Sequence, residues 1–130
     1  MNSAIALKQY QQTGVHSGVM DASPHRLIQM LLDGSLERIL QAKGHMKRNN
    51  IARKGEQISS AIAIVEGLRN SLDMKAGGEI STNLDALYEY IAGVLLRANI
   101  KNDPSLLDEA GRLLSEIKAA WDLVDPNATP

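Results

Sequence analysis

The chain of 130 residues contains no cysteine and no phenylalanine. The lack of cysteine excludes disulfide bonds, thiolate metal sites and cysteine nucleophiles, and it is compatible with a reducing compartment. Three tyrosines and one tryptophan are the only aromatic residues, so the core must be aliphatic, and stacking platforms for single-stranded nucleic acid are nearly excluded. A net charge of −1 also argues against a uniformly basic nucleic-acid-binding protein.

Long hydrophobic runs are lacking as well. The first twenty residues hold one lysine and no continuous apolar stretch of seven residues, which disfavours a secretory signal peptide. The longest run without a charged or strongly polar residue covers 90–96 and is far shorter than the ~20 residues needed to cross a bilayer. We therefore expect a cytoplasmic protein without membrane insertion.

Amphipathic segments make up most of the chain. In each segment, apolar residues recur at alternating spacings of three and four, which is the period of a helix with one buried face. No strand-like alternation competes with this pattern. The predicted helices cover approximately residues 24–46, 51–73, 79–100 and 105–123.

Turn and cap signals separate these segments. A polar residue followed by proline, which favours a helix start, occurs at Ser23-Pro24 and again at Asp103-Pro104. Gly77-Gly78 predicts the end of the second helix. Because short connections force neighbouring helices to run antiparallel, the predicted fold is all-α, an antiparallel four-helix bundle.

The first residues are set apart from this bundle. Ile5 and Leu7 allow a short helix, but the polar and glycine-rich stretch 13–18 interrupts it. We therefore expect a short N-terminal helical arm and linker over 1–22. The bundle follows over 23–125, and 126–130 form a disordered tail.

Charge is distributed unevenly along the chain. Residues 1–55 carry eight basic and three acidic side chains, or +5, whereas 56–130 carry six basic and twelve acidic ones, or −6. Packing the two halves together places a positively charged half beside a negatively charged one, which weakly favours assembly of the bundle. A basic binding site is the functional alternative, but a solvated helix-turn-helix corner is favoured because no aromatic residue or phosphate loop accompanies the charges. The basic residues concerned are Lys43, Lys47, Arg48, Arg53 and Lys54.

Catalytic and metal-binding motifs are not found. A di-iron helical bundle requires Glu-x-x-His pairs, and none occurs. His16, His25 and His45 are too far apart to share a helix face as metal ligands. His45, followed by Lys47 and Arg48, leaves a histidine phosphotransfer bundle as an alternative, although it lies at a helix end. We expect neither enzymatic activity nor a cofactor nor a metal.

The apolar faces of the helices are wider than a four-helix bundle requires. A broad, closely packed core explains this excess, and the alternatives are a groove for a partner's amphipathic helix or a homodimer interface. Tyr88 belongs to the excess and is a candidate partner-binding residue. We expect Leu96, Leu107 and Leu114 to include positions that face a partner more than the core.

Several short strings occur in an order and spacing that together are highly specific. They are Ser23-Pro24-His25-Arg26-Leu27-Ile28-Gln29-Met30-Leu31, Asp33-Gly34, Gly77-Gly78-Glu79-Ile80, Leu87-Tyr88-Glu89-Tyr90 and Ala120-Trp121. On these strings the sequence resembles the flagellar secretion chaperones of the FliS family. The resemblance extends in register from Tyr10 to Trp121.

This resemblance implies a chaperone that holds newly made flagellin, blocks its premature polymerisation and delivers it to the flagellar type III export apparatus. In the family, an elongated apolar surface receives the disordered C-terminal segment of flagellin, which becomes helical on binding. The family's N-terminal arm covers part of that surface and contributes an apolar residue and a tyrosine, which match Leu7 and Tyr10. A component of the export gate and a flagellar regulatory protein are further expected partners, and the chaperone is a monomer or a homodimer.

Overall fold

A computed structural model describes residues 22–124 of the chain. Regular structure within this range is entirely helical, which confirms the all-α prediction. The predicted arm with Leu7 and Tyr10, and the predicted tail, lie outside the described residues. The helices are α2 (Pro24–Lys47), α3 (Ile51–Asn70), α4 (Met74–Lys101) and α5 (Pro104–Asp122).

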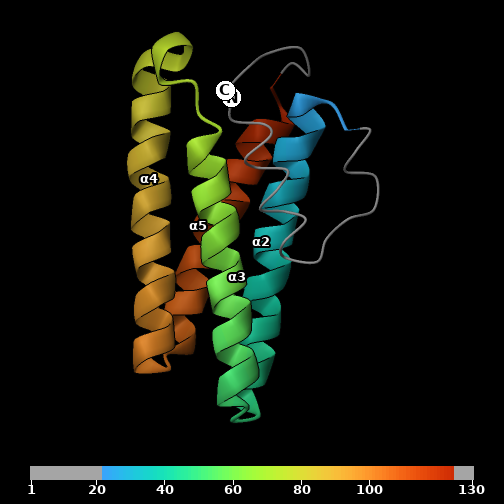
Figure 1. The fold of residues 1–130 in the computed structure, drawn as a ribbon, viewed down its shortest axis with the longest axis vertical. Helices are drawn as coiled ribbons and strands as arrows, with labels where there is room; N and C mark the ends of the chain where they lie inside the picture. The colour runs from blue at the N-terminus through green and yellow to red at the C-terminus, as the bar shows by residue number, and fades with distance from the viewer. Residues whose placement is uncertain (1–21, 125–130) are drawn as a thin grey trace.

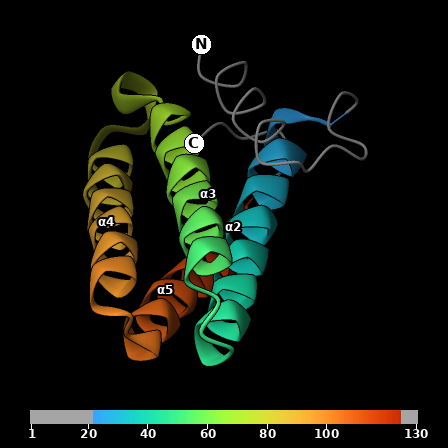
Figure 2. The same ribbon diagram turned by 60° about the horizontal axis from the view of Figure 1, so that its bottom comes forward.

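The helices form a closed cycle of contacts, in which α2 and α4 each pack against both α3 and α5. Successive helices run in opposite directions because short turns join them (Figure 1). α4 and α5 meet at their connecting turn and separate toward their other ends, as both ribbon views show (Figures 1 and 2). The bundle is therefore closed at the α4–α5 turn and open at the end where α4 begins and α5 finishes.

A side-chain cap begins each of these helices. An oxygen of each cap residue accepts a hydrogen bond from a backbone N–H in the first turn, which satisfies a group that the helix itself leaves unpaired. The caps are Ser23 for α2, Asn50 for α3, Asp73 for α4 and Asp103 for α5.

The boundary between the second and third helices differs from the prediction. α3 ends at Asn70, and Asp73 begins α4 by accepting a hydrogen bond of 2.9 Å from the backbone N–H of Ala76. Gly78 lies within α4 as a kink, with φ 54° and ψ −127°. Glycine reaches this left-handed conformation without the steric cost that a Cβ imposes, so Gly78 bends a helix rather than ending one.

The core is aliphatic, and it contains most of the residues that widened the apolar faces. Ile80, an apolar residue near the start of α4, is 72% exposed and lies outside this core. The broad-core interpretation therefore explains most of the excess. Fully buried members of that excess are Leu31, Ile64, Leu68, Leu95, Leu107 and Leu114.

Lys54, a predicted surface cation, connects two helices of the bundle. Lys54 is buried, and its Nζ donates to the backbone oxygen of Asn99 at 3.1 Å and to Oδ1 of Asn102 at 3.0 Å. These bonds tie the start of α3 to the end of α4. Lys43 also has a partner, since its Nζ lies 2.6 Å from Oδ1 of Asp108. Including Lys54 in an exposed basic corner was therefore wrong.

Candidate functional site

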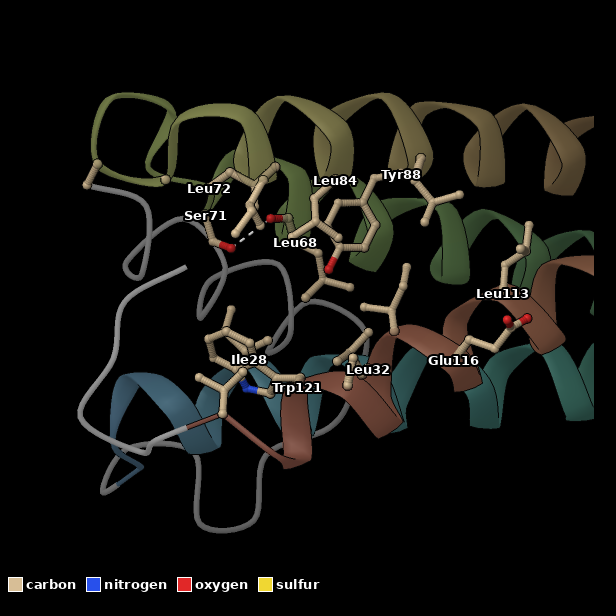
Figure 3. Close-up of a pocket in the computed structure, with 17 residues that line it drawn as sticks. Ile28, Leu32, Leu68, Ser71, Leu72, Leu84, Tyr88, Leu113, Glu116 and Trp121 are labelled. Carbon is tan, nitrogen blue, oxygen red and sulfur yellow. Dashed lines mark hydrogen bonds between the residues drawn. The ribbon is translucent and has the colours of Figure 1, made fainter.

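An apolar groove of about 640 Å³ occupies the open end of the bundle. Helices α4 and α5 supply most of its lining, and α2 and α3 contribute where they pack beneath the gap (Figure 3). We call it the α4–α5 groove. Its volume falls within the roughly 300–1,000 Å³ typical of ligand sites. Its principal lining residues are Ile28, Leu32, Leu68, Leu72, Ile80, Leu84, Leu87, Tyr88, Leu113, Ile117, Ala120 and Trp121.

The kinked start of α4 forms one end of this groove. Ala76, Gly77 and Ile80 line it on the two sides of the Gly78 kink. The buried hydroxyl of Ser81 donates a hydrogen bond of 3.0 Å to the backbone oxygen of Asp73 and so connects the two sides of the bend. The kink thereby places the first turn of α4 at the groove.

A contact between the start of α2 and the end of α5, which lie at the same end of the bundle, positions the tryptophan of the groove. The His25 ring stacks on the Trp121 indole with centroids 4.9 Å apart and planes inclined by 19°. Trp121 Nε1 donates to the backbone oxygen of His25 at 3.0 Å, and His25 Nε2 lies 3.2 Å from the backbone oxygen of Trp121. The stacking and both polar contacts fix the indole as part of the groove wall.

The polar groups of the groove are few. Glu116 is its only charged lining residue within 22–124, and Arg112 Nη1 lies 2.8 Å from its carboxylate. The Ser71 hydroxyl donates to the backbone oxygen of Leu68 at 2.7 Å. Tyr88 is 3% exposed, and burial raises the pKa of its hydroxyl. Such a surface is suited to binding an apolar face rather than to acid–base chemistry.

Three other functional features were considered: a metal site, a membrane-spanning helix and a phosphotransfer histidine. Within 22–124 the first two are not found, and the third lies away from the groove. No group of three or more His, Asp or Glu side chains within 22–124 is arranged to hold a metal ion. No helix in this range has the length and apolarity needed to span a membrane. His45 is in the last turn of α2, at the end of the bundle remote from the groove, and its Nδ1 lies 3.2 Å from Arg48 Nη2.

The three candidate leucines lie in different environments. Leu107 and Leu114 are completely buried, whereas Leu96 is 52% exposed but does not line the groove. That the three include a partner-facing position stays a prediction, and Leu96 is the exposed one. On α5 the groove is lined instead by Leu113 and Ile117. Periodicity identified the apolar face of this helix, but the separation of α4 from α5 decides which part of that face is open.

The fold and the groove define a helical bundle with an open apolar groove. The profile of the family described as "Flagellar protein FliS" matches residues 6–128. The chain therefore belongs to the FliS family, as its sequence strings indicated.

Relatives in three bacteria support this assignment over nearly the whole chain. Flagellar secretion chaperone FliSB of Pseudomonas aeruginosa is 54% identical over 117 residues, which cover 90% of this chain and 93% of that protein. Flagellar secretion chaperone FliS of Salmonella typhimurium is 43% identical over 130 residues, with 99% and 96% covered. The Vibrio cholerae protein of the same name is 42% identical over 121 residues, with 93% and 89% covered.

Proposed function

We propose that the chain is a cytoplasmic export chaperone that binds the disordered C-terminal segment of flagellin in the α4–α5 groove. Bound in this way, flagellin is kept from premature polymerisation and is delivered to the flagellar type III export apparatus. The names of the relatives support the chaperone role. The observation that carries the choice of site is the groove itself, an open apolar surface between two helices that have separated.

The shape of the groove suits an amphipathic helix. α4 and α5 diverge, so a third helix that enters between them can bury its apolar face against both. A flagellin segment that is disordered in solution orders as it binds, and this ordering offsets part of the contact energy. Affinity is then moderate for the area buried, which permits release at the export gate.

Individual residues have different parts in this proposal. Tyr88 contacts the segment from within the groove, whereas Leu96 offers a further apolar contact on the exposed face of α4. Leu107 and Leu114 support the groove through the core. The arm residues Leu7 and Tyr10 act in partner handling and delivery to the export gate.

A titration with a peptide from the flagellin C terminus tests the proposal. Ile80 is 72% exposed and lines the groove, so Ile80→Asp places a charge there at little cost to folding. Leu40 is 69% exposed on α2 and does not line the groove, so Leu40→Asp is the matched control. We expect stoichiometric binding to the wild type and to Leu40→Asp, and at least about tenfold weaker binding to Ile80→Asp, or about 1.4 kcal/mol. A wild type that does not bind the peptide would refute the proposed function.

A further inference from the structure

The Tyr88 hydroxyl is a polar group without a partner in an apolar environment. The residue is 3% exposed, and its oxygen is directed from α4 toward the interior of the groove (Figure 3). Among residues 22–124 no group forms a hydrogen bond with this hydroxyl, and desolvation alone accounts for its raised pKa. Tyr88 thus differs from Tyr90, whose hydroxyl donates to Glu109.

Among residues 22–124, the buried side-chain polar atom without a hydrogen bond is Oε1 of Gln57, so the Tyr88 hydroxyl opens onto the groove, where water reaches it in the free protein. A partner helix that fills the groove removes this water, and the hydroxyl then carries a desolvation penalty unless the helix supplies a hydrogen bond. The other polar groups of the groove do not relieve it, because Ser71 donates to the backbone of its own helix and Glu116 faces Arg112. A ligand that supplies the missing partner accounts for a tyrosine here.

We propose that the Tyr88 hydroxyl is the hydrogen-bond anchor of the α4–α5 groove. It selects a partner helix that places one neutral polar side chain, asparagine, glutamine, serine or threonine, among aliphatic residues on the same face. This inference rests on the proposed function, since it specifies the chemistry of the segment that the groove receives.

The groove restricts the anchor to an uncharged side chain. A carboxylate at Tyr88 would be buried without a cation among the described lining residues and would also face the field of Glu116. A buried ammonium or guanidinium group would likewise lose its hydration without a carboxylate beside Tyr88. The backbone of a bound helix is already paired internally, so a side chain must supply the contact.

Removal of the single hydroxyl tests the anchor. Tyr88→Phe keeps the ring, so we expect an unchanged or higher melting temperature and about three- to tenfold weaker binding of the flagellin C-terminal peptide, the range of one net hydrogen bond. Tyr90→Phe, which removes a hydroxyl that lies outside the groove, is the matched control and should bind within twofold of the wild type. Equal affinities for wild type and Tyr88→Phe would overturn the inference.

A scan of the peptide supplies an independent test on the wild-type protein. Each asparagine, glutamine, serine and threonine of the peptide is replaced by an apolar residue of similar shape, such as Thr→Val or Gln→Met. We expect one position at which the replacement weakens binding to the wild type but has no further effect on Tyr88→Phe, because the two groups form one bond. Replacements that all leave affinity unchanged, or that add fully to Tyr88→Phe, would overturn the anchor while leaving the proposed function intact. A wild type that binds no peptide would instead refute the proposed function.

Discussion

The stacked rings of His25 and Trp121 join the beginning of α2 to the end of α5. The two residues are 96 positions apart in the chain. Nε2 of His25 lies near the backbone oxygen of Trp121, and Nε1 of Trp121 donates to the backbone oxygen of His25. Because Trp121 also lines the groove, we expect this contact to link the stability of the bundle to the shape of the groove.

Replacing His25 should therefore weaken both folding and binding. His25→Ala removes the stacked pair and one polar contact, so we expect a loss of about 1–3 kcal/mol in the free energy of unfolding, measured by urea denaturation. His45→Ala is the control, since His45 lies on the partly exposed last turn of α2 and should change stability by less than about 0.5 kcal/mol. Equal losses in the free energy of unfolding for the two substitutions would show that the contact between His25 and Trp121 does not stabilise the bundle.

The kink in α4 leads to a second prediction. Gly78 has φ 54°, so Gly78→Ala should destabilise the chain by about 1–3 kcal/mol even though space for a Cβ is open. Gly93 is in the regular part of α4, also with open space, and Gly93→Ala should stabilise by up to about 1 kcal/mol. Thermal unfolding of both variants measures the contrast. A gain in stability for Gly78→Ala would rule out the kinked conformation.

The boundary between α3 and α4 could not be predicted from local sequence signals alone. Gly77-Gly78 is a valid stop signal, but Asp73 supplies an N-cap five residues earlier than Gly78, and the capped helix continues through the glycine as a bend. The two local signals conflict, and in the structure the cap of Asp73 and the hydrogen bond from Ser81 to the Asp73 backbone hold the turn before Gly78. Cap chemistry correctly predicted the starts of α2 and α5, where Ser23 and Asp103 had no rival.

The candidate site was harder to predict than the fold. Leu113 and Leu114 are adjacent, and both lie on the apolar face of α5, yet Leu114 is fully buried and Leu113 lines the groove. Their difference depends on the rotation of α5 and on its distance from α4, which a periodic pattern does not contain. Tyr88 was a candidate because it belonged to the apolar excess of the helices, but the absence of a hydrogen-bond partner for its hydroxyl within 22–124 depends on the packed neighbours, which the sequence pattern does not contain.

Because Tyr88 is buried, alkaline pH should lower the free energy of unfolding of the wild type. Its pKa is raised above the ordinary value of 10.0, so the neutral phenol is favoured in the folded chain, and the unfolded chain ionises first. The resulting contribution to stability is complete below pH 10 and declines as the pH rises above it. We therefore expect the free energy of unfolding to fall more steeply above about pH 10 for the wild type than for Tyr88→Phe. Parallel pH profiles would contradict the buried position of this side chain.

The phosphotransfer alternative predicts that His45 is phosphorylated, whereas the proposed chaperone function predicts that it is not. If the chain were a phosphotransfer bundle, acetyl phosphate or a histidine kinase would label it, and His45→Gln would abolish the acid-labile phosphate. We expect no labelling of the wild type and unchanged binding of the flagellin peptide by His45→Gln, because His45 lies at the end of the bundle remote from the groove. Labelling that disappears in this variant would establish the alternative.

NMR chemical-shift changes in the full chain would show directly where the flagellin C-terminal peptide binds. We predict that the largest changes fall on the groove-lining parts of α4 and α5, including Leu84, Tyr88 and Ile117, while the α2–α3 turn at Asn49 remains unaffected. Saturable binding with shifts confined to surfaces outside the α4–α5 groove would show that flagellin does not bind in this groove.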